Sequence, residues 1–463
     1  MRGSPWGEGD VTFACGGPQG VEEASPPRRR GRTGGDGAAS TAGEVPGWRR
    51  HRVGAGDAAY GGSVSTTQAG PAGTTSGGGP TSGGGAAPDG TPLVDQLVDW
   101  ELAVRVAGRL APPGPQVTRA EADRAVTQLR RLAERATGHV AETTGLDVPP
   151  DTGAVVVDRT GWARANAAAF RELLEAPVVR ARDARRERDE RDGRRRREDG
   201  PGSAAAVALG RRATGAEVGA LLAYLAPRVL GQYDPFGPDP AGAAARAPGE
   251  PGRLLLVAPN VVAVERELRL RPRDFRLWVC LHEETHRVQF TAAPWLAGHL
   301  RARTEGLVGD VVGEPGQLLA RLRAAAQRLP GAVSEGGDGL VGIMATPEQQ
   351  AVVAEVTAVM SLLEGHADVV MDEVGPSVVP SVATIRERFT ARRGGRPGLD
   401  RVVRRLLGLD AKMRQYRDGA AFVRGVLADV GVDGLNAVWT GPEQLPRPAE
   451  IADPRAWVRR VHG

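Results

Sequence analysis

The sequence predicts a mainly α-helical domain with a few short strands, preceded by a long tail without a hydrophobic pattern. Three observations predict this fold class. Apolar residues recur at helical spacing over most of the chain from residue 93 onward. Two apolar runs, 154–157 and 254–257, have the length and flanking residues of short strands. The 64 glycines and 35 prolines of the 463-residue chain lie largely in the first 92 residues and in later loops.

The tail is expected to be disordered and of low complexity over residues 1–92. Stretches such as TTSGGGPTSGGGAAPDG have no periodic apolar pattern, so nothing in them offsets the entropy cost of ordering. Residues 93–463 are predicted to form one folded domain. Two linkers are expected inside it, at about 180–203 and about 234–252, where charged residues or Gly, Pro and Ala dominate.

Charge and cysteine content exclude several classes of protein. The chain has a formal net charge of +4, but residues 180–197 alone carry ten arginines and five acids, so the rest is near neutral. Such a run is typical of a solvated linker, and no nucleic-acid partner is expected. Cys15 and Cys280 are too far apart for a disulfide scaffold, and no apolar run is long enough to cross a membrane. A cytoplasmic protein is predicted, with its oligomeric state left open.

Helices are expected on both sides of the second strand candidate. In the first half they are predicted at 93–110, at 118–146, at 162–174, and at 204–230 as one helix or a pair. In the second half they are predicted at 261–268, 273–290, 347–373, 381–391, 398–408 and 415–430. Capping-box patterns mark two of the starts, at Thr118 with Glu121 and at Thr346 with Gln349.

The helix at 273–290 contains the pattern His-Glu-x-x-His, with His282, Glu283 and His286. Positions i and i+4 of a helix face the same way, so the two imidazoles can bind one metal ion. Glu283 projects beside that position, where a carboxylate can take a proton from water. Apolar residues precede the motif on every face, which predicts a buried helix and polar groups that need partners. The pattern therefore predicts a zinc site rather than an exposed helical turn.

A third zinc ligand is required, and two glutamates are candidates. Glu364 lies on the long helix at 347–373, on a face of small and partly polar residues. Glu305 is closer in sequence, but Gly306 and Gly309 follow it and weaken a ligand-bearing helix. Glu364 is the favoured ligand, and Glu305 remains the alternative.

Three further residues are candidates for supporting roles. Asp368, one turn after Glu364, could orient an imidazole by accepting its second N–H. His366 is either a satisfied core histidine or a donor to the transition state. Tyr416 is a second candidate donor, although a packing role is the more common one for such a residue.

Several blocks of the sequence resemble the actinobacterial zincin-like metallopeptidase family, formerly a domain of unknown function. They are LLLVAPN (254–260), RDFRLWVCLHEETHRVQFTAAPWLAGHL (273–300), LLEGHADVVMD (362–372), KMRQYRDGAAFV (412–423) and GLNAVWTGPEQLPRPAEIADPRAWVRRV (434–461). The segment LVDWELAVRVAGRL (97–110) resembles the branch associated with biosynthesis of a deazaflavin coenzyme. The resemblance implies a zincin-like fold with His282 and His286 as zinc ligands, Glu283 as catalytic carboxylate and Glu364 as third ligand.

The leading functional hypothesis is zinc-dependent hydrolysis of a peptide or related amide. In this hypothesis Glu283 acts as general base on a water activated by zinc. A strand at 254–257 could hold the substrate backbone at its edge. The alternative is a zinc-binding scaffold or partner-binding protein of the same fold without turnover.

Overall fold

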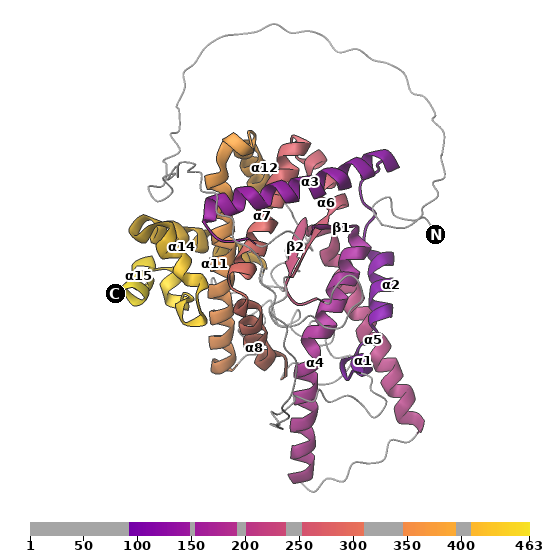
Figure 1. Ribbon diagram of the computed structural model, residues 1–463. Helices are drawn as coiled ribbons and strands as arrows, with labels where there is room; N and C mark the ends of the chain where they lie inside the picture. The colour runs from indigo at the N-terminus through magenta and orange to yellow at the C-terminus, as the bar shows by residue number, and fades with distance from the viewer. Residues whose placement is uncertain (1–91, 149–152, 192–200, 238–251, 310–345, 395–408) are drawn as a thin grey trace, which may run out of the picture.

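The computed structural model describes residues 92–148, 153–191, 201–237, 252–309, 346–394 and 409–463 (Figure 1). Most of these residues are helical, and three short strands form one small sheet. The helices are α1 (Val94–Leu97), α2 (Trp100–Leu110), α3 (Arg119–Thr144), α4 (Arg159–Arg191), α5 (Pro201–Leu225), α6 (Ala258–Glu267), α7 (Pro272–Ala292), α8 (Trp295–Gly309), α11 (Pro347–Val378), α12 (Val382–Gly394), α14 (Leu409–Asn436) and α15 (Pro454–His462). Short 3-10 turns η1 (Ala226–Arg228), η2 (Ala437–Trp439), η3 (Pro442–Gln444) and η4 (Pro448–Ile451) connect some of them. The predicted mainly α-helical fold class is confirmed.

The sheet consists of β1 (Val155–Val157), β2 (Gly231–Asp234) and β3 (Arg253–Val257), with β3 in the centre. β3 runs parallel to β1 and antiparallel to β2. Leu254 and Leu256 pack in the core that includes α3, α6 and α7, while Leu255 and Val257 pack in the core that includes α2 and α4. Because both faces of β3 are covered, its sequence is a continuous apolar run rather than an alternating one.

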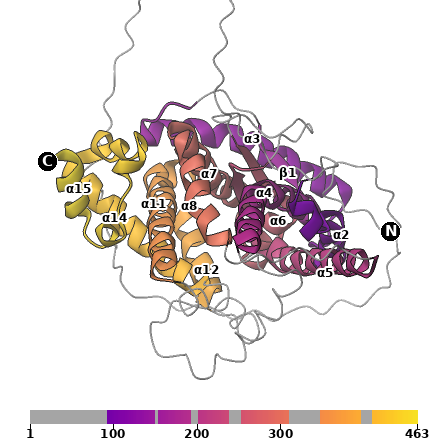
Figure 2. The same cartoon turned by 90° about the horizontal axis from the view of Figure 1, so that it is seen from below.

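The helices α7 and α11 lie at the centre of the fold. The buried residues of α7 and the end of α11 share one hydrophobic core with α3. The earlier part of α11 belongs to a second core with α8, α14 and α15. Figure 2 shows the result: α14 and α15 lie at one end of the molecule, α2 and α5 lie at the other, and α7 and α11 lie between them.

Both predicted capping boxes are present. Thr118 accepts a hydrogen bond from the backbone N–H of Glu121, whose side chain accepts from the backbone N–H of Thr118. Thr346 and Gln349 form the same reciprocal pair at the start of α11. Each box satisfies backbone donors that the first helical turn leaves without partners. These local patterns therefore place the starts of the two long helices correctly.

The prediction of a linker at about 180–203 was wrong at both ends. α4 continues through Arg191, and α5 begins at Pro201; residues 192–200 lie outside the described part of the chain. Within α4, Arg186 pairs with Glu190 at 3.1 Å, four residues along the helix. Arg and Glu are good helix formers, and such pairs stabilise a helix further. The charges of this run up to Arg191 thus lie on a helix with exposed side chains.

The strand β2 was not predicted: it lies between the helix expected at 204–230 and the linker expected at about 234–252, and only its last residue overlaps that linker. Its backbone pairs with β3 from Gly231↔Leu256 to Asp234↔Arg253. β2 is therefore an outer strand of the sheet, whereas β3 has a partner on each side. The prediction that the strand at 254–257 offers an edge to a substrate was consequently wrong. Residues 238–251 of the expected linker lie outside the described part.

Other predictions concern residues that the structure does not describe. The predicted tail, apart from its last residue, and the predicted helix at 398–408 fall there. Within the described residues, none of the helices combines the length and the apolar character needed to span a membrane.

Candidate metal centre

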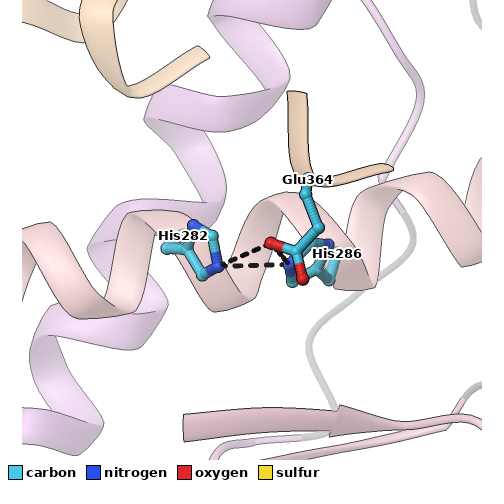
Figure 3. Close-up of side chains that lie close together, drawn as sticks. All are labelled: His282, His286 and Glu364. Carbon is cyan, nitrogen blue, oxygen red and sulfur yellow. Dashed lines mark hydrogen bonds and ion pairs between the residues drawn. The ribbon is translucent and has the colours of Figure 1, made fainter. Parts of the chain in front are cut away.

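Helix α7 brings His282 and His286 together on one face. The two residues are one helical turn apart, and their Nε2 atoms lie 3.2 Å from each other. The rings meet edge to face, with centroids 4.7 Å apart (Figure 3). The five residues before the motif, Leu277 to Leu281, are all buried, as the sequence predicted. A helix buried on all sides holds the two imidazoles in a fixed relation.

Glu364 reaches the same point from α11. Its Oε2 atom lies 3.5 Å from Nε2 of His282 and 3.6 Å from Nε2 of His286. Figure 3 shows the carboxylate of Glu364 directed at the two rings from the neighbouring helix. Only 8% of Glu364 is exposed. Among the described residues, these three side chains form a group whose ligand atoms could hold a metal ion.

The spacing of the three ligand atoms fits a tetrahedral zinc ion. Zinc bonds of about 2.0–2.2 Å at tetrahedral angles separate neighbouring ligand atoms by about 3.3–3.6 Å. The observed separations are 3.2, 3.5 and 3.6 Å. The two distances to Glu364 are longer than a normal hydrogen bond. Two imidazole nitrogens and one carboxylate oxygen are also a donor set that catalytic zinc sites use.

The electrostatics of the site favour a bound cation. Burial lowers the pKa of His286, but its interaction with the Glu364 carboxylate and the negative charge of Glu283 raise it. A hydrogen bond to Gln289 also raises the pKa, which reaches about 9. The metal-free site therefore holds a proton on His286 at neutral pH, and a metal ion would take the place of that positive charge.

Glu283 lies beside this centre against the first residue of β2. Its exposed fraction is 7%. A Cβ atom at Gly231 would lie 2.5 Å from Cγ and 2.9 Å from Oε1 of Glu283, so only glycine leaves room for this side chain. The packing between α7 and β2 thus determines where the Glu283 carboxylate lies.

Gln289 completes the centre and was missed by the sequence analysis. It lies on α7, three residues after His286, and none of its surface is exposed. Its Oε1 is 2.9 Å from Nδ1 of His286, and its Nε2 is 2.8 Å from the carbonyl oxygen of Leu363 and 3.0 Å from Nδ1 of His366. The spacing His-x-x-Gln on a buried helix was the available signal, because residues three apart are neighbours on one face.

His366 is a buried core histidine behind the metal centre. It is 1% exposed, and its ring packs edge to face against Trp439, with centroids 5.4 Å apart. Burial, and secondarily the positive charge of His286, lower the pKa of His366 to about 3. Neutral His366 contacts Gln289. His366 is therefore a buried residue whose Nδ1 contacts Gln289 rather than the metal position.

The remaining candidates lie elsewhere or outside the described side chains. Asp368 forms an ion pair with Arg386 of α12 at 3.0 Å instead of contacting an imidazole. Glu305, the alternative third ligand, pairs with Arg180 of α4. Tyr416 lies within the backbone span of α14, but its side chain is outside the described part. The geometry thus groups Glu364, not Glu305, with the two histidines.

An HExxH helix that meets a glutamate from a second helix is typical of the zincin class of metallopeptidases. The sequence matches a family described as zincin-like metallopeptidases over residues 98–458, and the chain belongs to this family. It is also similar to the crystal structure of a proposed hydrolase with a novel fold from Chloroflexus aurantiacus. That similarity has a TM-score of 0.51 at 31% identity and covers 79% of this chain and 99% of the other. No curated protein matches the chain.

Proposed function

We propose that this protein is a zinc-dependent hydrolase that cleaves a peptide or related amide bond. His282, His286 and Glu364 hold the zinc ion, and Glu283 is the general base. The observation that carries the proposal is the triangle of three ligand atoms with edges of 3.2–3.6 Å, with Glu283 next to it on the same helix. Membership of a zincin-like metallopeptidase family and similarity to a proposed hydrolase support the same reaction class.

Zinc held by these residues would supply Lewis acidity and lower the pKa of a water molecule to about 7. Glu283 accepts a proton from the water as its oxygen attacks the substrate carbonyl carbon. Glu283 then donates that proton to the leaving nitrogen as the carbon–nitrogen bond breaks. Amide and water thereby become a carboxylic acid and an amine. Burial of Glu283 excludes bulk water from its carboxylate and keeps it close to the reacting atoms.

The outer strand β2 takes the place of β3 as the proposed substrate edge. The backbone N–H of Val257 donates to the carbonyl oxygen of Leu230. Because hydrogen-bonded pairs alternate along antiparallel strands, the backbone groups of Gly231 point away from β3. An extended peptide pairing there would lie next to Glu283. We propose this edge as the substrate backbone site.

The metal ion is tested by titrating the purified protein with zinc and measuring bound metal. We expect one zinc ion per chain, and a loss of at least a hundredfold in affinity for His282→Ala and for His286→Ala, because each removes one of three ligands. Glu305→Ala is the matched control and should keep full affinity, because Glu305 pairs with Arg180 instead. Zinc binding that survives in both histidine variants would contradict the assignment.

The affinity for zinc is expected to depend on pH through His286. Because its pKa in the metal-free protein is about 9, zinc must displace a proton from this imidazole throughout the range from pH 6 to 8. The apparent affinity should fall about tenfold for each unit by which the pH is lowered. Calorimetry in buffers of different ionisation enthalpy should report release of about one proton at pH 7. An affinity independent of pH would refute this expectation.

A methyl group at Gly231 is expected to slow hydrolysis without removing the metal. In Gly231→Ala the new Cβ would lie 2.5 Å from Cγ of Glu283, so the carboxylate must move away from its position. We expect a loss of at least tenfold in kcat, since small misplacements of a catalytic group have large effects. Zinc content should stay at the level of the unmodified protein. Full activity in this variant would argue against Glu283 as the base.

Two predictions from the sequence extend beyond the site. A cytoplasmic location and an association with deazaflavin coenzyme biosynthesis stay predictions, and the second would be tested by deleting the gene and measuring the coenzyme. A zinc-binding scaffold without turnover is the result expected if the zinc-loaded protein hydrolyses no peptide.

A further inference from the structure

We propose that Gln289 is a positioning residue that fixes both the tautomer of His286 and the placement of Glu364, and that His366 locks Gln289 in the required orientation. The proposal rests on the zinc site described above. It assigns roles to two buried residues that are not themselves ligands. Gln289 would act through His286 and through the backbone of α11, and His366 would act through Gln289.

The orientation of the Gln289 amide follows from the carbonyl oxygen of Leu363. A carbonyl oxygen can only accept, so the group 2.8 Å from it must be the amide nitrogen, Nε2. The oxygen Oε1 is then the group that faces Nδ1 of His286 at 2.9 Å. Because an amide oxygen can only accept, Nδ1 of His286 must carry a proton. The Nε2 atom of a neutral His286 is consequently left with its lone pair directed at the metal position.

The second hydrogen of the same amide nitrogen determines the state of His366. Gln289 Nε2 donates to Nδ1 of His366 across 3.0 Å, and this nitrogen must therefore accept. Acceptance requires that Nδ1 of His366 carries no proton, so the proton of this imidazole lies on Nε2. The Gln289 amide thus accepts one hydrogen bond, from His286, and donates two, to Leu363 and His366. Rotating the amide by 180° would set two acceptors against each other at Leu363.

The same contacts connect the two helices that carry the ligands. Gln289 is on α7 with His286, whereas Leu363 and His366 are on α11 and lie on either side of Glu364 in the sequence. The hydrogen bonds therefore hold the segment that contains Glu364 at a fixed position along α7. Trp439 packs against the His366 ring from outside α11, which restricts the motion of that ring. One side chain thus sets the geometry of two of the three ligands.

Burial makes these contacts strong determinants of geometry. Gln289 and His366 are 0% and 1% exposed, so water cannot replace a lost partner. A buried polar group without its partner costs about 1–3 kcal/mol. Residues that orient a metal-bound histidine typically change metal affinity by ten- to a hundredfold when replaced. We expect an effect in that range for Gln289.

The test compares zinc affinity and histidine tautomers in variants of the full chain. Affinity is measured by competition with a chromophoric chelator at equilibrium, and the tautomer of His286 by ¹⁵N NMR of the zinc-bound protein with labelled histidine. Gln289→Met keeps a similar volume but has no donor and only a weak acceptor in place of the amide. We expect a ten- to hundredfold loss of zinc affinity, and loss of the signal of a proton held on Nδ1 of His286 by a hydrogen bond. His366→Phe should cause a smaller loss in the same direction.

Two comparisons separate positioning from general destabilisation. Gln128→Met removes another amide, one that accepts from Arg276 between α3 and α7 away from the metal centre, and it should leave zinc affinity unchanged. The double variant Gln289→Met/His366→Phe should lose no more affinity than Gln289→Met alone, because His366 acts through Gln289. Additive losses of zinc affinity would show that the two residues act independently. That result would contradict the proposal that His366 acts by orienting Gln289.

Zinc binding by the unmodified protein distinguishes failure of the positioning role from failure of the proposed function. If the unmodified protein binds no zinc, the zinc-hydrolase proposal is wrong, and the positioning role falls with it. If the unmodified protein binds zinc and Gln289→Met binds it equally well with unchanged ¹⁵N signals, the positioning proposal alone is wrong.

Discussion

Replacing Glu283 by glutamine is expected to lower the hydrolysis of peptides by a factor of about 10² to 10⁴ while the protein keeps its zinc. Glutamine has nearly the same shape as glutamate and fits beside Gly231, but its amide cannot accept a proton from water. The three ligand side chains are unchanged in this variant. The expected loss therefore falls on the proton transfers of the reaction and not on the metal.

The measurement follows cleavage of a broad peptide mixture by mass spectrometry, together with zinc content and thermal unfolding. Glu305→Gln is the matched control, because it makes the same chemical change at a glutamate that pairs with Arg180. It should retain the activity of the unmodified protein. Equal activity in Glu283→Gln and the unmodified protein would show that Glu283 is not the general base. Zinc binding by the three ligands would not be affected by that result.

The local part of the site was predictable from the sequence because helix geometry is local. His282 and His286 are four residues apart, and this spacing alone places them on one face of a helix. The capping box at Thr346 and Gln349 likewise placed the start of the helix that carries Glu364. Which glutamate lies next to the two histidines depends on tertiary packing. The sequence therefore favoured Glu364 over Glu305 as the third ligand without deciding between them. The packing of α11 against α7 brings Glu364 to the two imidazoles.

What the sequence did not predict depends on contacts between segments that are distant along the chain. The role of Gln289 depends on Leu363 and His366, which the packing of α11 places next to it. The strand β2 has only four residues and exists through pairing with β3. Asp368 lies one helical turn after Glu364, but its carboxylate pairs with Arg386 of α12. In each case tertiary packing brings the partner that determines the contact, and the local sequence does not name it.

Among the described glycines, the two whose added Cβ atom would lie nearest to backbone atoms are beside Glu364, where α11 crosses α14. A Cβ atom at Gly365 would lie 2.1 Å from the carbonyl carbon of Gly419 and 2.4 Å from the backbone nitrogen of Ala420. A Cβ atom at Gly419 would in turn lie 1.9 Å from the carbonyl oxygen of Ser361. Both overlaps involve backbone atoms, which cannot rotate away. Glycine at both positions is therefore required for the helices to approach this closely.

Gly365→Ala is accordingly expected to lower the free energy of unfolding by about 3 kcal/mol and to weaken zinc binding at the same time. Overpacking in a core costs about 1–3 kcal/mol or more. Here the three atoms nearest to the new methyl group belong to the backbone of α14, so the helix itself must move. The displacement of α11 relative to its neighbours also moves Glu364, the adjacent residue, away from the histidines. Chemical denaturation of the metal-free protein and zinc titration measure the two effects separately.

Gly138→Ala gives the matched control, because it makes the same substitution inside a helix with free space around it. Nothing lies within 4 Å of a Cβ atom at Gly138 in α3. Alanine is there expected to raise the free energy of unfolding by about 0.5–1 kcal/mol through its higher helix propensity, with zinc affinity unchanged. Opposite signs for the two variants would establish the crossing at Gly365 as the cause. If both variants were stabilised and bound zinc equally, the close approach of α11 and α14 would not be what holds Glu364 at the metal centre.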